Sequence, residues 1–203
     1  MMSVLPKIEQ IQSAPSSPQS PLSNALDILF EHSPILVNTL EPQLHAVLQT
    51  IAPISSYNQL IDVALESIGK WEAEAQAQFI SGHPRIGENK NLSMLSASEQ
   101  GAQGIKPTPP EVLARLAHLN ACYEKIYPDL RYITFVNGRS RAEIAEEMEQ
   151  VLKLPHSLSP HEPSVETLSQ IDKESNEWRS ELSRAIQDIG KIAKSRLGVL
   201  GAY

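Results

Sequence analysis

Three short segments carry polar side chains in arrangements that could bind or protonate a small molecule. The first is His83-Pro84, which follows an apolar helical pattern that stops at Gly82. Because a proline disfavours helical geometry in the residue before it, His83 is expected just past a helix C-terminus, where the helix dipole favours the imidazolium form. Such an imidazole could hold an anion or transfer a proton. A simple capping cation is the alternative, and it is favoured on local grounds.

The second segment is Ser96-Ala97-Ser98-Glu99-Gln100. Ser96 and Glu99 have the spacing of a capping box, in which each side chain accepts from the other residue's backbone N–H. The same geometry would leave free amide donors at a helix N-terminus, where they bind anions or polar rings. Glu99 and Gln100 would add a carboxylate and an amide to that site. Capping is favoured locally, and ligand binding is the alternative.

The third feature is Arg196, which lies on the core-facing stripe of the last helical pattern, four residues after Ile192 and four before Leu200. A buried guanidinium is costly unless it is paired. We therefore expect Arg196 either in a structural ion pair or on a substrate carboxylate, with neither favoured. Arg139 and Arg141 also suggest an anion site, but a solvated first helical turn is favoured for them.

Other polar residues are expected to be structural. Glu31-His32 could form a catalytic pair, although packing or capping is favoured. Asn120 flanks an apolar stripe and is expected in an interhelical hydrogen bond. Cys122, the only cysteine, lies within a helical pattern and is expected to be a buried, inert thiol.

Helical periodicity dominates the chain and defines the elements that must position these residues. Residues 1–21, rich in Pro, Ser and Gln, predict a flexible leader. Helices are expected over roughly 24–30, 34–51 with a kink or break at Pro42, 57–69, 71–81, 96–103, 112–126, from Ser140 onward, and in a long terminal segment from about 168. Residues 131–136 are the only strand-like stretch. The prediction is an all-α, single-domain bundle over 22–203, with about seven or eight helices and little or no strand.

Composition excludes several classes of function. The 203 residues carry a net charge of -7 without a Lys/Arg cluster, which disfavours a nucleic acid or an anionic membrane as partner. One cysteine excludes an internal disulfide framework, and the six histidines lack metal-ligand spacing, so no metal is expected. The absence of a membrane-spanning run or a signal core predicts an intracellular protein, cytoplasmic or peroxisomal, although the chain does not end in Ser-Lys-Leu.

Five segments, in order, resemble the family of decarboxylases that act on 2-oxo-4-hydroxy-4-carboxy-5-ureidoimidazoline (OHCU). The segments are Phe30-Glu31-His32-Ser33-Pro34, Gly82-His83-Pro84-Arg85-Ile86-Gly87, Ser96-x-x-Glu99-Gln100, Leu119-Asn120-x-x-Tyr123-Glu124 and Gly138-Arg139-Ser140-Arg141-x-Glu143-Ile144. Each motif alone is weak, but five in this order, spread over about Leu22 to Leu200, are specific.

The resemblance implies an all-α homodimer that completes urate degradation in purine catabolism, removing CO2 from OHCU to give (S)-allantoin without a cofactor. It implies that His83 is the proton donor and that Glu99 acts beside it. The remaining pocket residues that it implies are Pro84, Ser96, Ala97, Ser98, Gln100, Tyr132, Ile133, Thr134, Phe135, Val136 and Arg196.

Two other functions remain open from the sequence. A non-enzymatic helical adaptor would expose an apolar groove and would tolerate changes at His83 and Glu99. A hydrolase or isomerase of a related ureide would have a similar pocket but a different product, and chiral detection of allantoin separates it from a decarboxylase.

Overall fold

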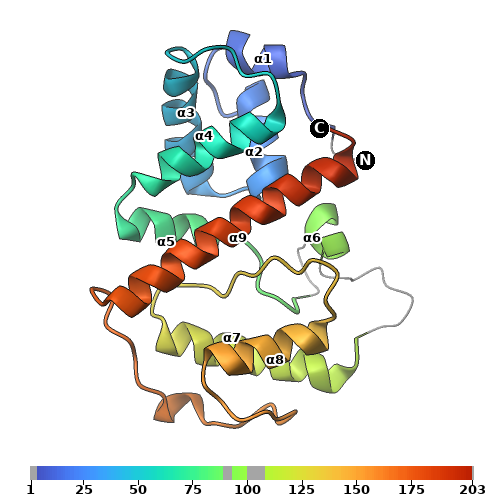
Figure 1. Cartoon of the computed structure of the whole chain (residues 1–203), viewed down its shortest axis with the longest axis vertical. Coiled ribbons are helices and arrows are strands. Elements are labelled where there is room, and N and C mark those ends of the chain that lie inside the picture. The colour runs from blue at the N-terminus through green and yellow to red at the C-terminus, as the bar shows by residue number, and fades with distance from the viewer. Residues whose placement is uncertain (1–3, 89–92, 100–107, 203) are drawn as a thin grey trace. The chain divides into compact units, whose positions relative to one another are not determined.

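The computed structural model describes residues 4–88, 93–99 and 108–202, apart from the side chains of Ser98 and Glu99. Within these ranges the chain forms nine α-helices and no β-strand, which confirms the all-α prediction. The chain divides into two compact units (Figure 1). Unit 1 is Met1–His83 with Ile186–Tyr203, and unit 2 is Pro84–Ala185. The prediction of one domain over 22–203 stays a prediction.

Unit 1 is built from helices joined by short turns. It contains α1 (Ile8–Ser13), α2 (Pro21–Phe30), a π-helical segment (Leu36–Leu40), α3 (Glu41–Leu48), α4 (Tyr57–Gly69), α5 (Ala73–Ser81) and the second part of α9 (Asn176–Leu200). The apolar stripes of these helices form its core, with Leu26, Leu29, Leu40, Leu44, Leu60, Ile61, Ile68, Ile80, Ile189 and Leu197 all buried. Burying one such side chain contributes about 1.5–3 kcal/mol.

The predicted break at Pro42 is present as a change of helix type. Leu36–Leu40 is π-helical, and α3 begins at Glu41 with the proline in its first turn. A proline has no N–H and its ring clashes with the carbonyl four residues earlier, so the wider π turn accommodates it.

Residues 4–21 are packed in unit 1, which differs from the predicted flexible leader. They contain α1, whose Ile11 is only 1% exposed. The Ser16 and Ser20 hydroxyls donate to the carboxylate of the buried Glu41 at 2.6 and 2.7 Å. One buried isoleucine and these hydrogen bonds produce no apolar periodicity, so composition alone predicted a free segment.

Unit 2 has longer connections between its helices. It contains α6 (Met94–Glu99), α7 (Pro110–Ile126), α8 (Arg141–Val151), a 3-10 turn (Val165–Thr167) and the first part of α9. Helices α7 and α8 lie side by side (Figure 1). The hydrogen bond from Arg141 Nη1 to Thr108 Oγ1, at 3.3 Å, shows that the two helices begin at the same end. Helix α8 begins after Ser140, as predicted, and Ser140 and Glu143 form a capping box at its start.

The predicted apolar stripes of unit 2 hold over part of their length. Val112, Leu116, Leu119 and Tyr123 are buried along α7, as their spacing predicts. The terminal helix begins only at Asn176, so the expected stripe before that residue lies in loop structure. None of the helices described is long and apolar enough to cross a membrane.

Candidate active site

His83 lies just past the C-terminus of α5, as predicted. Its N–H donates to the carbonyl of Ile80 at 3.0 Å, and its ring meets the Phe79 ring edge-on at a centroid distance of 5.7 Å. The residue is buried, with 3% of its surface exposed.

A close backbone approach fixes the position of His83. A Cβ added to Gly82 would lie 2.8 Å from Ser33 Cβ, a distance that real Cβ atoms do not show. Only glycine therefore lets the end of α5 pack on Ser33. This contact links the Ser33-Pro34 motif with the His83-Pro84 motif, although some 50 residues separate them.

The loop after His83 is held by side chains of α7. Arg85 Nε and Nη2 donate to the two carboxylate oxygens of Glu124 at 2.5 and 3.0 Å, and these bonds raise the pKa of Arg85 despite the opposing effect of burial. Asn120 Nδ2 donates to the carbonyl of Ile86 at 2.9 Å. The partner of Asn120 is therefore this loop and not a second helix. Pro84, a predicted substrate contact, is the first residue of unit 2 and is half-buried.

One face of α7 makes all of these contacts. Gly87 has a φ of +86° and packs so closely on Leu116 that an added Cβ would meet its Cβ at 3.1 Å. Leu116, Asn120 and Glu124 are spaced four residues apart, which places them on the same side of the helix. The loop that follows His83 is thus fixed by a single helix face.

The helix that carries Ser96 begins earlier than predicted. Ser96 N donates to Ser93 Oγ at 3.1 Å, and Ala97 N donates to the Ser93 carbonyl at 2.9 Å. Ser93, and not Ser96, therefore occupies the N-cap position of α6, and the capping box expected between Ser96 and Glu99 is wrong. A second serine three residues upstream provided the cap, and Ser96 is buried within the first turn.

The other predicted residues of this segment are described only in part. Ala97 is half-buried in α6. The backbone of Ser98 and Glu99 completes the helix, their side chains are not described, and Gln100 lies outside the described residues. The roles of Glu99 and Gln100 therefore stay predictions.

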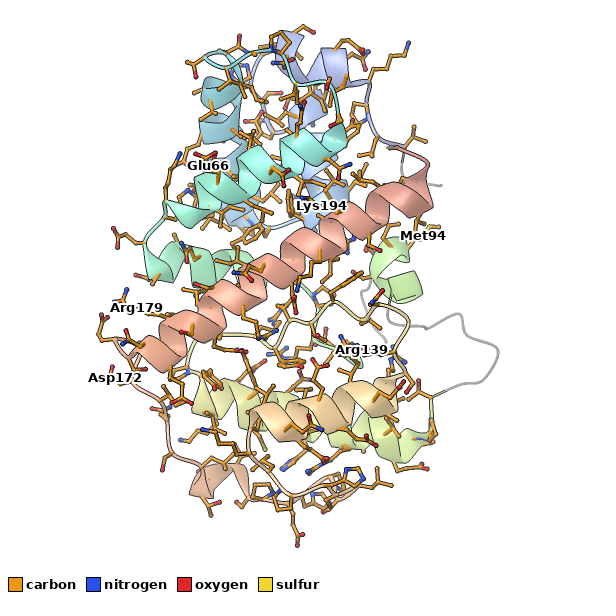
Figure 2. The ribbon with its side chains drawn as sticks, in the orientation of Figure 1. Glu66, Met94, Arg139, Asp172, Arg179 and Lys194 are labelled. Atoms are coloured by element: carbon orange, nitrogen blue, oxygen red, sulfur yellow. The ribbon has the colours of Figure 1, made fainter. Side chains whose placement is uncertain are left out.

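The extended segment 131–136 is anchored by its side chains. Tyr132 is buried, its hydroxyl donates to Glu147 at 2.6 Å, and burial raises its pKa to about 12. Thr134 Oγ1 donates to the same carboxylate at 3.0 Å. Arg139, labelled in Figure 2, forms an ion pair with Glu147. One glutamate of α8 therefore fixes alternate residues of the segment.

Two arginines bind the backbone carbonyls of the same segment. Arg184 Nη1 donates to the Ile133 carbonyl at 2.8 Å. Arg139 Nη2 and Nε donate to the carbonyls of Phe135 and Val136 at 2.5 and 2.9 Å. The guanidinium groups take the place that a neighbouring strand would have in a sheet.

The N–H groups of the segment are differently placed. Within the part of the chain that the structure describes, those of Ile133, Thr134 and Val136 have no protein acceptor. Three carbonyls of the segment are occupied, and these three N–H groups could donate hydrogen bonds to the carbonyl or anionic edge of a planar molecule.

Arg184 is itself held in place by buried acidic and aromatic groups. Its Nε and Nη2 donate to the two oxygens of Glu181 at 2.8 and 2.7 Å, and the Tyr123 hydroxyl donates to Glu181 at 2.5 Å. The guanidinium also lies over the Tyr132 ring, 5.3 Å from its centroid. Although burial opposes the charged form, Glu181 raises the pKa of Arg184.

Arg196 forms the structural ion pair that was one of its two predicted roles. It is buried, Nη2 donates to Glu31 Oε1 at 2.6 Å, and Nη1 donates to the carbonyls of Ile28 and Leu29 at 3.0 and 3.1 Å. These bonds close the end of α2, where Glu31 has a φ of +63° that non-glycine residues rarely adopt. A role on the substrate stays a prediction.

The contacts of the remaining polar residues decide between their predicted roles. His32 pairs with Asp27 at 3.0 Å and is exposed, so Glu31 and His32 do not form a pair. Arg141 is 8% exposed, and its predicted place in a solvated turn is wrong because its side chain reaches Thr108. Cys122 is buried, and burial raises the pKa of its thiol, as expected for an inert cysteine.

Comparison with known proteins decides the family. A model of the OHCU decarboxylase family matches residues 15–198, which include parts of both units. The chain belongs to the OHCU decarboxylase family. The prediction from the five motifs is confirmed. No curated protein sequence matches the chain.

Two solved structures share the fold. A crystal structure of OHCU decarboxylase in the presence of (S)-allantoin aligns with a TM-score of 0.56 and 18% identity, covering 87% of this chain and 96% of that chain. A crystal structure of (S)-allantoin synthase aligns with a TM-score of 0.54 and 16% identity, covering 95% of this chain and 53% of that chain. This chain therefore spans about half the length of the second protein.

The predicted site residues belong to both units. His83 and Arg196 belong to unit 1, whereas Pro84, Ser96, Ala97 and the segment 132–136 belong to unit 2. In the described ranges, no group of three or more His, Cys, Asp or Glu side chains is arranged to hold a metal ion.

Sequence reasoning missed the residues that hold the site in place. Arg184, Glu147 and Glu124 were missed because Ile133, Thr134 and Arg85, which they bind, lie 13 to 51 residues away in the sequence. One local signal was available: Glu181 and Arg184 are three residues apart, the spacing of an ion pair on one helix face.

Proposed function

We propose that this chain removes CO2 from OHCU and forms (S)-allantoin, without a cofactor. The observation that carries the proposal is the family match over residues 15–198, which includes His83-Pro84 and the segment 132–136. The buried imidazole and the available amide donors described above support it.

The substrate provides its own electron sink. When the bond between the carboxylate carbon and the ring breaks, CO2 leaves and the electron pair moves toward the neighbouring carbon–nitrogen double bond, whose nitrogen is protonated. The resulting enol loses its hydroxyl proton, becomes the ring carbonyl, and takes a proton on the adjacent carbon, which becomes the stereocentre. This chemistry needs no pyridoxal, thiamine or metal ion.

His83 is the residue that we assign to proton transfer. It would take the proton from the substrate hydroxyl or deliver one to the new stereocentre, and Glu99 would orient it and bind the ureido or ring N–H groups. General acid–base catalysis of this kind contributes about 10²–10⁴-fold to the rate. The packing of His83 on Phe79 and the tight contact of Gly82 with Ser33 support a fixed ring orientation.

The remaining site residues would bind and orient the ring. The amides of Ile133, Thr134 and Val136 are suited to oxygens on which negative charge develops as CO2 leaves. Pro84, Ser96, Ala97, Ser98, Gln100, Tyr132 and Phe135 would complete the pocket wall. Arg196 would hold a substrate oxygen, although its bonds to Glu31 support the structural alternative.

The direct test generates the substrate in place, by treating urate with urate oxidase and hydroxyisourate hydrolase. Addition of this chain should accelerate the formation of allantoin and give the (S) enantiomer, followed by circular dichroism. Formation of racemic allantoin at the spontaneous rate would contradict the proposal and favour an adaptor. Substrate loss without (S)-allantoin would favour a hydrolase or isomerase.

Glu99 is tested by a conservative change. A catalytic role predicts that Glu99→Gln loses most turnover while the free energy of unfolding stays within about 0.5 kcal/mol of wild type. A purely structural role predicts a measurable loss of stability with near-normal turnover.

The homodimer implied by the family resemblance and the location predicted from the sequence also belong to this proposal. A homodimer predicts a light-scattering mass twice that of one chain. A cytoplasmic or peroxisomal location, with no nucleic acid or membrane as partner, is checked by fractionating the source cells.

A further inference from the structure

Arg141 differs from the other buried arginines in what its guanidinium binds. Three arginines are buried in the described part of the chain: Arg115, Arg141 and Arg196. Arg115 pairs with Glu149 at 2.7 Å and Arg196 with Glu31 at 2.6 Å. For Arg141, no carboxylate of the described residues lies within ion-pair distance, and its one hydrogen bond is the 3.3 Å contact of Nη1 with Thr108 Oγ1.

The unused part of this guanidinium is the edge that carboxylates prefer. Nε–H and Nη2–H of an arginine point in parallel and together take both oxygens of a planar carboxylate. In this molecule Arg85 binds Glu124 and Arg184 binds Glu181 through that edge. The Nε and Nη2 atoms of Arg141 are buried and have no partner among the described residues.

The surroundings of Arg141 favour a negative charge. It is the first residue of α8, and Thr108 stands two residues before the first residue of α7, so the positive ends of two helix dipoles meet here. The acidic residues of these first turns, Glu111 and Glu143, are exposed. Burial alone lowers the pKa of Arg141, with no opposing contribution from an acid.

We propose that Arg141 is a binding site for a small-molecule carboxylate, which accepts two parallel hydrogen bonds from Nε and Nη2 while Thr108 holds Nη1. The guanidinium charge, which no carboxylate of the described residues pairs, becomes paired when the small-molecule carboxylate binds. Phosphate could present two oxygens to the same edge, and the experiment distinguishes the two. The site does not depend on the proposed decarboxylation.

The test measures thermal unfolding of the full chain in sodium acetate, sodium phosphate and sodium chloride at equal ionic strength. Acetate should raise the wild-type Tm in a saturable way, and chloride should not. In Arg141→Met the apparent acetate affinity should fall by about 10- to 100-fold, the loss expected for one or two charge-assisted hydrogen bonds. In chloride alone this variant should unfold at the same or a higher temperature than wild type, because a buried unpaired charge is removed.

Two further variants control the result. Arg179→Met changes an exposed arginine of α9 (Figure 2) and should leave the acetate response unchanged. Arg141→Lys keeps the charge but removes the two-donor edge, so it should fold and bind acetate about tenfold more weakly. It keeps the proposal testable if the methionine variant does not fold.

A direct readout is the Nε–H resonance of Arg141 in a ¹⁵N spectrum, assigned by its loss in Arg141→Lys. It should shift as acetate is added, and (S)-allantoin, which has no carboxylate, should not reverse that shift. An equal acetate response in wild type and both Arg141 variants would overturn the proposal. A response to phosphate without one to acetate would overturn the assignment to a carboxylate.

Discussion

The two units fix the residues that we propose for function by different means. In unit 1, His83 is positioned by packing, with the Phe79 ring on one side and the Gly82–Ser33 contact behind it. In unit 2, no strand among the described residues pairs with the segment 131–136, and Arg139 and Arg184 bind its carbonyls instead. A side chain can thus be oriented by close packing, whereas an isolated extended backbone needs strong donors to its carbonyls.

This difference has a consequence for binding. A partner strand would bond both the carbonyls and the N–H groups of a segment, but guanidinium groups can only donate. Arginines that hold the carbonyls do not occupy the N–H groups, and those of Ile133 and Thr134 have no acceptor among the described residues. The donor-only character of the guanidinium groups therefore accounts both for the support of the segment and for its proposed binding role.

The largest expected effect comes from removing an arginine of unit 2. Arg184→Met leaves the buried Glu181 carboxylate and the Ile133 carbonyl without their cation. Breaking a fully buried pair from one side costs about 3–5 kcal/mol. Arg184 is only half-buried, so we expect a smaller loss of about 2–3 kcal/mol in urea unfolding. Arg184→Lys should recover only part of it, because lysine lacks the two-donor edge. A loss below about 1 kcal/mol would mean that the guanidinium does not hold the segment.

The matching experiment in unit 1 tests packing. Gly82→Ala places a Cβ against Ser33 and should lower the free energy of unfolding by about 1–3 kcal/mol, the usual cost of overpacking. Turnover should fall as well, because His83 is displaced. Ser33→Gly removes the opposing Cβ, so the double variant should be more stable than the sum of the two single changes predicts. Simple additivity in the double-mutant cycle would show that this contact does not position His83.

A smaller effect should follow acidification. Although burial favours the neutral acid, hydrogen bonds from His156 and Arg115 lower the pKa of Glu149 below its ordinary value of 4.5. A carboxyl whose pKa is lower in the folded than in the unfolded state stabilises the fold above pH 4.5, and this contribution is lost as the pH falls through the folded value.

The control for this pH effect is Glu149→Gln. Its free energy of unfolding should change less than that of wild type between pH 6 and the acid range, since it lacks the titrating group. The same pH slope in both proteins would exclude Glu149 as its source.

The smallest expected effect concerns the loop after His83. Asn120→Ala leaves the Ile86 carbonyl without its donor, and a neutral hydrogen bond contributes about 0.5–1.5 kcal/mol. We expect a stability loss in that range, with a larger relative loss of turnover if the loop positions His83. Normal turnover in this variant would show that the contact between α7 and the loop does not affect catalysis.

Features with a local signal could be predicted from the sequence. The spacing of Val112 to Tyr123 gave the buried face of α7, the Ser140 and Glu143 pair gave the start of α8, and Gly82 gave the end of α5. The position of His83 followed from the last of these. The family followed from five motifs in order.

Features that depend on distant partners could not be predicted. The burial of Arg141 depends on Thr108, 33 residues earlier, and the packing of residues 4–21 depends on Glu41. Neither contact produces a periodic pattern in the sequence. The start of α6 was missed for a different reason, because Ser93 and Ser96 both suit an N-cap and sequence alone does not rank them.

The central claim, that the imidazole of His83 transfers a proton during decarboxylation, is tested most directly by comparing two histidine variants. His83→Asn should keep the helical circular dichroism and Tm of wild type and lose about 10²–10⁴-fold in the enzymatic rate of (S)-allantoin formation. His32→Asn, at an exposed histidine of unit 1, should turn over normally. An (S)-allantoin rate in His83→Asn equal to that of wild type would contradict the account.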